Sequence, residues 1–418
     1  MCSEAGQPIR KFEAVMKNRR EFLVHAAGGL AAAAVLPELG FVRLPDRSAG
    51  LRVGVIGAGR QGRTILGELT KLDGAEVAAV CDIDERRMQS GLRRSSGAEG
   101  FQSVTEMLSS GKVDAVAIAT PTQTHADVAK ECIDAGVHTY IDGPLCNTSE
   151  KCQEIVTAAR GAKGVVASGL QGRSNPVYKL ARTFFRSDSV RDLVGMRAQH
   201  CQKTSWRTPA SDPAREKALN WRLDPEVTLG LAGEWGTQQF DVFHWYTGRY
   251  PVKVTGSGTI RLHDDGREIA DTVACTLTYE DGATIQYEAT LANSYEGTYE
   301  LLRGTNAAIK LGWSHGWMFK EADAPTQGWE VYANRQQFHN DEGITLIADA
   351  TKLASQGKLK EGIGLPNPAL YYTLADFVAA ATNGEAPACS VEEAARATAV
   401  GIAAHQAVVS GQEQSISV

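Results

Sequence analysis

Residues 51–63 read LRVGVIGAGRQGR, a short apolar run that ends in a glycine-rich turn and continues into an amphipathic segment. In the pattern G-x-G-x-x-G each glycine has a separate task. Gly57 makes the tight turn, Gly59 lets the backbone approach a pyrophosphate, and Gly62 lets the following helix lie close to the strand. The stretch therefore predicts a strand, a phosphate-binding turn and a helix whose N-terminus faces the phosphates.

The residues that follow favour a dinucleotide-binding fold. Residues 76–81 are a second apolar strand, and Asp82 ends it about 20 residues beyond Gly62, where an acid accepts a hydrogen bond from a ribose hydroxyl. A carboxylate at this place repels a 2′-phosphate, which favours NAD over NADP. Arg86 and Arg87 follow a turn later, so NADP stays open as the cofactor.

Helical and strand periodicities then alternate as far as residue 168. We expect helices over 103–110, 124–135 and 149–160, and strands over 113–119, 138–142 and 164–168. This alternation predicts a doubly wound parallel sheet, which binds ligands at the carboxyl ends of its strands. The predicted cofactor contacts are Gly57, Gly59, Arg60, Gln61, Gly62, Asp82, Thr120, Pro121, His125, Asp142, Gly143 and Pro144. A second interpretation of His125 is a cap of the helix that follows Thr124.

The second half of the chain predicts a different sheet. Strand alternation marks 252–260, 272–279, 283–291, 297–303 and 307–311, with Asp281 and Gly282 as a hairpin turn. These segments predict an open antiparallel sheet that packs one face on helices. An uncovered opposite face favours association with a second copy of the chain, so we expect a homo-oligomer that forms through this sheet.

The expected fold class is α/β. An N-terminal Rossmann domain with a doubly wound parallel sheet spans 50–170, and a C-terminal α+β domain with a large, mostly antiparallel open sheet spans 171–418. A chain of 418 residues is long enough for two such cores. The net charge of -6 comes without a basic stripe, so we expect no nucleic-acid partner.

Cysteine usage gives no sign of a metal site. The eight cysteines include no CxxC pair and no zinc-like histidine spacing, so no metal is expected. Buried free thiols are the simplest interpretation, and a disulfide stays open in case the protein is exported.

Residues 1–49 predict an export signal and a linker. Arg19 and Arg20 precede Phe22, Leu23 and an Ala- and Gly-rich apolar run over 26–36. The run is shorter than the ~20 residues that a bilayer-spanning helix needs. It resembles a twin-arginine signal, which predicts recognition by the twin-arginine export machinery and a periplasmic or otherwise exported protein, with an uncleaved leader as a membrane tether left open. An amphipathic N-terminal helix is the alternative.

Aromatic and acidic residues between the two halves predict a substrate pocket. The segment from residue 197 to 245 holds four of the seven tryptophans of the chain, namely Trp206, Trp221, Trp235 and Trp245. Aromatic faces beside polar groups suit sugar rings, and each tryptophan has a place in the core as its alternative. A helix over 231–246 would align Glu234, Gln238, Asp241 and Trp245 on one stripe, which we expect to face the substrate.

Four stretches in this order, "GVIGAGRQG", "CDID", "ATPTQTHADVAKECIDAGVH" and "YIDGPLCNT", resemble the Gfo/Idh/MocA family of glucose-fructose oxidoreductases and inositol dehydrogenases. Later stretches such as "GRYPVKVTGSG" are similar to the second domain of that family. The resemblance implies an NAD(P)-dependent oxidoreductase that acts on a secondary hydroxyl of a sugar, polyol or glycoside.

The sequence departs from the family at both of its acid-base positions. Asp142-Gly143-Pro144 stands where the family has Glu-Lys-Pro, and Gln238 stands where a helix of the second domain has histidine. Glycine and glutamine cannot take a proton from a hydroxyl, so other groups must do so. The predicted catalytic residues are Glu234, Asp241 and Lys203, and the predicted substrate contacts are Gln171, Arg173, Trp206 and Gln238.

Three functions stay open on the sequence. The first is an oxidoreductase with rearranged acid-base groups. The second is a redox-neutral glycoside hydrolase that uses a bound NAD, and the third is a non-catalytic protein that binds a sugar or NAD. Export to a compartment without free NAD predicts that the cofactor is retained and regenerated in place.

Overall fold

The computed structural model describes residues 50–418 except 329, 331–332, 339–340 and 359–361. The predicted export signal lies outside the described residues. No helix in the described part of the chain combines the length and the apolar character that crossing a membrane requires.

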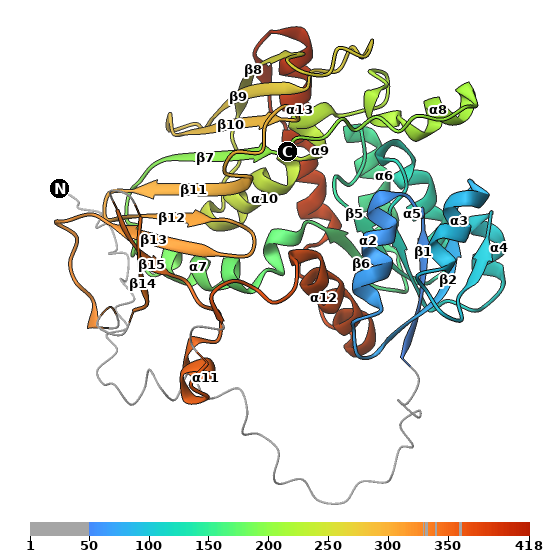
Figure 1. Ribbon diagram of the computed structural model, residues 1–418, viewed down its shortest axis with the longest axis horizontal. Coiled ribbons are helices and arrows are strands. Elements are labelled where there is room, and N and C mark those ends of the chain that lie inside the picture. The colour runs from blue at the N-terminus through green and yellow to red at the C-terminus, as the bar shows by residue number, and fades with distance from the viewer. Residues whose placement is uncertain (1–49, 329, 331–332, 339–340, 359–361) are drawn as a thin grey trace, which may run out of the picture. The chain divides into compact units, whose positions relative to one another are not determined.

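The N-terminal half forms a parallel sheet of six strands (Figure 1). In chain order the strands are β1 (Leu51–Ile56), β2 (Ala75–Cys81), β3 (Glu99–Phe101), β4 (Ala115–Ile118), β5 (His138–Asp142) and β6 (Val166–Gly169). Their order across the sheet is β3-β2-β1-β4-β5-β6, and every neighbouring pair is parallel. This confirms the predicted doubly wound sheet.

Helices and short 3-10 turns connect these strands. They are α2 (Arg60–Leu69), α3 (Glu85–Leu92), α4 (Val104–Ser109), η1 (Thr122–Thr124), α5 (His125–Asp134), α6 (Ser149–Arg160) and η2 (Gln171–Arg173). Side-chain caps fix several starts: Asp84 accepts from two backbone amides of α3, Ser103 caps α4 and Thr148 caps α6.

The second half forms a mostly antiparallel sheet of ten strands in the order β14-β15-β13-β12-β11-β7-β10-β9-β8-β16. The strands are β7 (Leu193–Cys201), β8 (Lys253–Thr259), β9 (Thr272–Thr278), β10 (Thr284–Thr290), β11 (Thr298–Gly304), β12 (Ala307–Leu311), β13 (Gly316–Lys320), β14 (Arg335–Gln337), β15 (Glu342–Thr345) and β16 (Gln414–Ser415). Among the pairs described, only β7 and β10 run parallel. The sheet confirms the predicted fold class.

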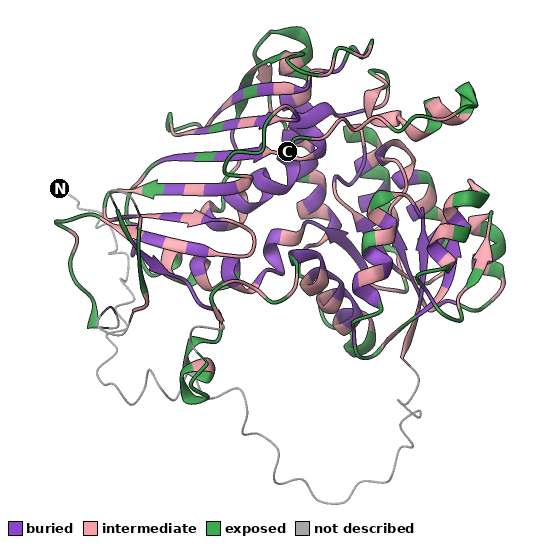
Figure 2. Cartoon of the chain, in the orientation of Figure 1, coloured by how far each residue is buried: buried purple, intermediate pink, exposed green. Residues whose placement is uncertain are grey.

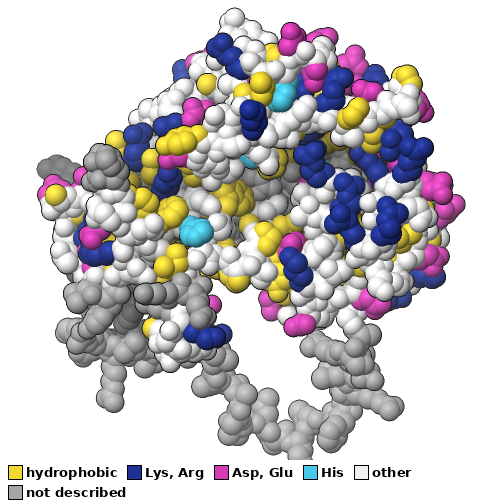
Figure 3. Space-filling view, in the orientation of Figure 1, with side chains coloured by type: hydrophobic (Ala, Val, Ile, Leu, Met, Phe, Trp, Pro, Cys, Tyr) yellow, Lys and Arg dark blue, Asp and Glu magenta, His cyan; other side chains and the backbone are white. Residues whose placement is uncertain are grey.

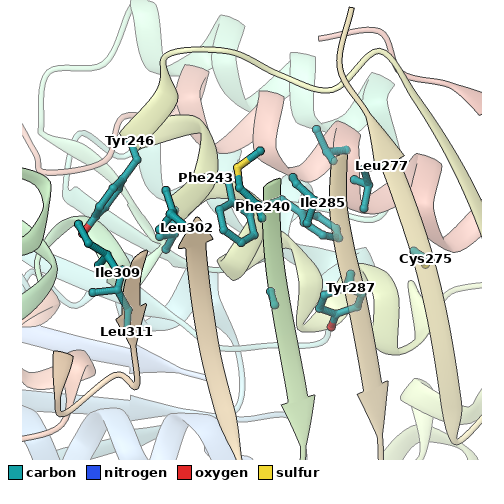
Figure 4. Packing of buried hydrophobic residues seen from close by; sticks show 14 of the residues in the cluster. Phe240, Phe243, Tyr246, Cys275, Leu277, Ile285, Tyr287, Leu302, Ile309 and Leu311 are labelled. Atoms are coloured by element: carbon teal, nitrogen blue, oxygen red, sulfur yellow. The ribbon is translucent and has the colours of Figure 1, made fainter. Parts of the chain in front are cut away.

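The helices of this half are α7 (Pro176–Arg186), α8 (Pro213–Leu219), η3 (Trp221–Leu223), α9 (Gly230–Glu234), α10 (Gly236–Thr247), α11 (Ala350–Ser355), α12 (Ala369–Asn383) and α13 (Val391–Ser410). Phe240 and Phe243 of α10 pack against sheet residues such as Tyr287 and Leu302, all at most 2% exposed (Figure 4). Figure 2 shows buried residues along most of α10 and of the Rossmann strands, while buried and more exposed residues alternate along strands such as β9 and β10.

The C-terminal helices α12 and α13 both pack on the Rossmann sheet, and α13 also packs on the large sheet. Phe377 of α12 lies in a core with strand residues of the Rossmann sheet. Helix α13 begins in the Rossmann core with Ala394 and continues into the core of the large sheet with Val400 and Ala404. Figure 1 shows α13 running between the two sheets, so the residues at their border lie on a shared framework.

Two local features differ from the sequence-based expectations. The single helix expected over 231–246 is two helices, because the backbone breaks at Trp235 between α9 and α10. Cys146 and Cys152 form a disulfide, whereas Cys81, Cys132, Cys275 and Cys389 are buried free thiols and Cys201 is a half-buried one.

Candidate functional site

The glycine-rich turn between β1 and α2 has the geometry of a phosphate cradle. Gly57 has φ +92°, and a Cβ there would meet the Ala119 carbonyl oxygen at 2.7 Å. A Cβ on Gly62 would overlap the carbonyl oxygen of Gly57. A Cβ on Gly59, by contrast, would have only Arg87 Nη1 near it, at 3.8 Å, and no side chain caps the start of α2. The first backbone amides of α2 are therefore available to bind a pyrophosphate, so the turn fits the phosphates of a dinucleotide.

Asp82 follows β2 and helps to hold this turn. Its Oδ2 accepts a hydrogen bond from Ala58 N at 2.7 Å, and its Oδ1 accepts one from Asp84 N at 2.8 Å. Burial raises the pKa of Asp82, and these two amides oppose the shift. Asp82 directly follows β2, as the sequence predicts, and both of its carboxylate oxygens are bonded to backbone amides. Its contact with a ribose stays a prediction.

His125 is part of the framework at the ends of β4 and β5. Its Nε2 lies 2.9 Å from the Thr120 carbonyl oxygen, and its Nδ1 lies 3.1 Å from that of Pro144. The side chain is 2% exposed, and burial lowers its pKa. Since both ring nitrogens face backbone carbonyls, His125 ties the two strand ends together, and Pro121 lies in the turn beside it.

The two positions at which the sequence departs from the family pattern are neighbours in space. A Cβ on Gly143 would lie 3.0 Å from Gln238 Nε2 and 2.8 Å from Leu170 Cδ2. Gln238 Nε2 donates to the Gly169 carbonyl oxygen, and its Oε1 accepts from Gln171 N, each at 2.9 Å. Gln238 thus fills the space beside Gly143 and ties α10 to the end of β6.

Two carboxylates face the carboxyl ends of the Rossmann strands. Asp142 ends β5, is half-buried and accepts a hydrogen bond from Gln61 Nε2 at 3.1 Å. Glu234 ends α9, is 6% exposed and accepts a hydrogen bond from the Thr122 hydroxyl at 3.2 Å. Elements from both halves of the chain therefore bring these acids to one edge of the sheet.

The third charge at this edge is Arg222. Its Nε lies 3.7 Å from Glu234 Oε2, and its guanidinium lies over the rings of Trp221 at 4.4 Å and Trp206 at 5.8 Å. Trp206 adopts φ +62°, a conformation that few non-glycine residues take. Two of the four tryptophans that the sequence analysis assigns to the substrate pocket, Trp206 and Trp221, thus pack on Arg222 beside Glu234.

These three charges influence one another. Burial raises the pKa of Asp142 to about 7, with the negative charge of Glu234 adding to the rise and Arg222 opposing it. Burial also raises the pKa of Glu234, and Arg222 again opposes the rise. An acid with a pKa near 7 can both accept and donate a proton at neutral pH, which suits a general base.

Arg173 and Asp241 form a buried ion pair. The Arg173 Nη2 lies 2.6 Å from Asp241 Oδ1 and 2.9 Å from Glu393 Oε2, while Nε donates to both Asp241 oxygens. Asp241 is 0% exposed, and Arg173 is 8% exposed. Asp241 and Arg173 therefore connect η2, α10 and α13 inside the core. This pairing gives no support to Asp241 as a catalytic residue or to Arg173 as a substrate contact.

Lys203 lies outside this site in the structure. It follows β7 by two residues, its side chain is exposed, and its backbone amide donates to the Ser294 hydroxyl at 2.8 Å. Within the described residues no hydrogen bond or ion pair joins the Lys203 ammonium to Asp142 or Glu234. The structure thus gives no support to Lys203 as the base.

Arg222 is the residue that the sequence-based reasoning missed. No motif marks it, since its role depends on Glu234 and on two tryptophans that come together only in the fold. Its position directly after Trp221 is the one local hint. Thr122, which donates a hydrogen bond to Glu234, lies in η1 just after the end of β4.

Two family models match the chain. An oxidoreductase-family model with an NAD-binding Rossmann fold matches residues 51–170. A GFO/IDH/MocA C-terminal domain model matches residues 178–310. Together they cover the Rossmann sheet and strands β7 to β11 of the large sheet, and the NAD-binding fold that the sequence predicts is confirmed.

Curated relatives include inositol dehydrogenases. An inositol 2-dehydrogenase of Pseudarthrobacter chlorophenolicus is 30% identical over 259 residues, which are 59% of this chain and 72% of that protein. Inositol 2-dehydrogenase 2 of Saccharopolyspora erythraea is 28% identical over 240 residues, 57% of this chain and 66% of that protein.

Solved structures of similar fold include a levoglucosan dehydrogenase in complex with NADH and levoglucosan. It has a TM-score of 0.70 and 17% identity and covers 88% of this chain and all of that one. A putative myo-inositol dehydrogenase from Sinorhizobium meliloti has a TM-score of 0.62 and 19% identity over 88% of this chain and all of that one. At these identities the likeness shows the fold.

Proposed function

The chain belongs to the GFO/IDH/MocA oxidoreductase family, and from this premise we propose that it oxidises a secondary hydroxyl of a sugar, polyol or glycoside. The observation that carries the proposal is the meeting of Asp142, Glu234 and Arg222 at the carboxyl ends of the Rossmann strands. Ligands of open α/β sheets bind at that edge. The substrates named for related proteins, inositol and levoglucosan, are compounds of this class.

Asp142 takes the hydroxyl proton in this proposal. NAD, when bound, supplies the acceptor for the hydride, so the protein must supply the acceptor for the proton. Asp142 is half-buried at the end of β5 and has a pKa near 7. Glu234, held by Thr122 and Arg222, then accepts a hydrogen bond from the substrate and orients it.

A contact between the two halves supports a retained cofactor. Arg215 of α8 makes an ion pair with Asp84, the residue that caps α3 beside the nucleotide turn, with 2.6 Å between Nε and Oδ2. Figure 1 shows the segment with α8 reaching across to the side of the Rossmann domain that carries α3. The segment would have to move before a nucleotide could leave past it.

A redox-neutral glycoside hydrolase is the second candidate, favoured by two carboxylates of raised pKa at one edge. In that reaction a hydroxyl is oxidised, the neighbouring carbon loses a proton, the aglycone leaves, water adds and the carbonyl is reduced again. One acid accepts the carbon-bound proton and another protonates the leaving oxygen. The NAD is unchanged at the end.

One set of assays separates these functions. The purified protein is incubated with sugars, polyols and nitrophenyl glycosides, and both NADH and nitrophenol are followed. Asp142→Asn and Glu234→Gln should lower turnover by about 10²-fold or more, whereas Asp134→Asn, a change from Asp to Asn at an exposed residue of α5, should not. NADH formation supports the dehydrogenase, and NAD-dependent nitrophenol release without NADH supports the hydrolase. Sugar binding without either product would refute both and leave a binding protein.

Location and assembly complete the proposal. We propose export by the twin-arginine route, on the strength of Arg19 and Arg20, and a homo-oligomer through the face of the large sheet opposite α10. That face carries exposed side chains such as Arg197 and Gln286. Cell fractionation of an Arg19→Lys, Arg20→Lys variant tests the first point, and light scattering of the purified protein tests the second.

A further inference from the structure

A hollow of about 480 Å³ lies between α7 and the end of α10. Its lining residues are Lys179, Arg182, Thr183, Arg186, Ser187 and Trp245. All of them except Trp245 lie on α7 or directly follow it. Trp245 lies nine residues along α10 from Gly236, which places it about 14 Å from the end of the helix that adjoins Glu234. The hollow is therefore separate from the candidate site at the Rossmann strands.

Arg182 is held in a fixed position at the wall of the hollow. Its guanidinium lies over the Trp245 ring at 4.8 Å, and its Nε donates to the Trp245 carbonyl oxygen at 2.8 Å. The entropy of ordering this long side chain is thus lost on folding, before any ligand binds. Within the described residues, its two Nη groups donate to no acceptor. They are available to a ligand, and a guanidinium binds the oxygens of an anion in pairs.

The charges around Arg182 are positive. Arg186 follows it by four residues, so the two share one face of α7. In the part of the chain that the structure describes, no carboxylate lies within ion-pair distance of either arginine. Burial lowers the pKa of Arg182, and the charge of Arg186 adds to this shift. Lys179 is the third cation and pairs with Asp376 at 3.1 Å. Like charges held close together favour the binding of an anion.

The hollow differs from the surface elsewhere. Figure 3 shows positive and negative side chains interspersed over much of the face that it presents. Exposed arginines commonly have an acid beside them, as Arg197 has Glu288 at 2.6 Å and Arg335 has Glu342 at 2.8 Å. A solvated helix face would explain unpaired charges alone. It does not explain a fixed Arg182 at the wall of a hollow whose volume falls within the roughly 300–1,000 Å³ of small-molecule sites.

Two hydroxyl groups complete the lining. Thr183 Oγ1 donates to the Leu180 carbonyl oxygen at 2.7 Å, and Ser187 Oγ donates to that of Phe184 at 3.0 Å. Each hydroxyl proton is thus used within α7, while each oxygen keeps a lone pair. The two oxygens can therefore accept hydrogen bonds from the hydroxyls of a ligand. The hollow offers donors for an anion and acceptors for alcohol groups.

We propose that this hollow is a second binding site, which takes a sugar that carries a phosphate or sulfate ester. Arg182 and Arg186 bind the oxyanion, and Thr183 and Ser187 accept hydrogen bonds from the sugar hydroxyls. A neutral sugar lacks the anion, and a free inorganic ion lacks the hydroxyls. The site uses no group of the candidate active site, so the proposal can fail while the oxidoreductase function holds, and the reverse.

The test is a calorimetric titration of the purified protein at low ionic strength. The probes are glucose 6-phosphate, glucose 6-sulfate, glucose and inorganic phosphate. At least one ester should bind about tenfold or more tightly than both glucose and inorganic phosphate. The ester that binds more tightly identifies which of the two anions the site takes. Arg182→Gln and Arg186→Gln should each weaken that ester by about tenfold, because each removes one charged donor.

Arg160→Gln is the matched control. Arg160 is an exposed arginine in the last turn of α6, as Arg186 is in the last turn of α7. Its replacement should leave the dissociation constant of the ester within about twofold of wild type. Thermal melting gives a second readout. Arg186→Gln should melt like wild type without ligand, because Arg186 is exposed, while its gain in melting temperature with the ester should shrink.

Three results would overturn the proposal. In the first, neither ester binds more tightly than glucose. In the second, inorganic phosphate binds as tightly as the esters, which would reduce the hollow to a plain anion site. In the third, Glu234→Gln weakens the ester and Arg186→Gln does not, which would place the ester in the candidate active site. Tighter binding of an ester that both arginine variants weaken, and Arg160→Gln does not, supports the proposal.

Discussion

Replacing Asp241 by asparagine should lower the stability of the protein and leave the chemistry of its folded molecules intact. Asp241 is 0% exposed, and its oxygens accept three hydrogen bonds from Arg173, at 3.1, 2.9 and 2.6 Å. The asparagine amide carries no charge and cannot balance the guanidinium of Arg173. The buried Arg173 would then have Glu393, whose side chain is 27% exposed, as its one remaining ion-pair partner among the described residues.

The structure sets the size of the effect. Removing one partner of a buried ion pair typically costs about 3–5 kcal/mol. Because Glu393 remains 2.9 Å from Arg173 Nη2, we expect the lower end, about 3 kcal/mol. With a urea dependence of about 3 kcal/mol/M or more for a chain of this size, the unfolding midpoint should fall by up to roughly 1 M. Arg173→Met combined with Asp241→Leu should recover most of the loss, because apolar pairs often replace buried ion pairs without cost.

Urea unfolding followed by tryptophan fluorescence measures this loss, and turnover per folded molecule is measured on the same samples. Asp376→Asn is the control, since its pair with Lys179 is 35% and 48% exposed and should contribute less than about 1 kcal/mol. An Asp241→Asn protein with the wild-type midpoint and no turnover would refute the structural interpretation. Asp241 would then belong with the catalytic residues.

Three further predictions follow from the site. Because Asp142 must be ionised to accept a proton, kcat/KM for oxidation should fall as the pH drops below about 7, and Asp142→Asn should lower it by about 10²-fold or more and remove this limb of the pH profile. Arg215→Ala should speed nucleotide release in a stopped-flow chase, whereas Lys217→Ala, 77% exposed on the same helix, should not; equal rates would contradict a retaining role for α8. Gly143→Ala should cost about 1–3 kcal/mol because its Cβ meets Gln238 at 3.0 Å, and an unchanged melting temperature would contradict this packing.

The Rossmann half could be predicted in detail because its signals are local. The glycines at 57, 59 and 62 and the alternation of helices and strands specify the turn and the sheet without reference to the rest of the chain. The packing partners of the C-terminal helices α12 and α13 could not be predicted in this way. Phe377 and Ala394 are ordinary apolar residues of helices, and nothing local indicates that they pack on a sheet formed some 200–300 residues earlier.

The candidate site was predictable only in part for the same reason. Helical periodicity places Glu234 and Asp241 on one stripe, and in the structure Glu234 contacts Thr122 of the Rossmann half, whereas Asp241 pairs with Arg173 just beyond it. Periodicity does not reveal the break at Trp235, after which Glu234 reaches Thr122 and Asp241 reaches Arg173. Which of two acids finds an arginine as its partner depends on the tertiary fold, so one stripe contains a candidate catalytic acid and a structural one.

The two departures from the family pattern are best understood as one change. Gly143 stands where the family pattern has a lysine, and Gln238 occupies the space next to it. Gln238 is hydrogen-bonded to the Gly169 carbonyl oxygen and to the Gln171 amide at the end of β6. A side chain at 143 would collide with Gln238 and Leu170 as they lie here, so position 143 is not free to change while Gln238 keeps this place. Proton transfer then depends on what remains at this edge. Asp142 adjoins Gly143 in sequence and interacts electrostatically with Glu234, which makes these two acids the groups that an acid-base mechanism in this protein would use.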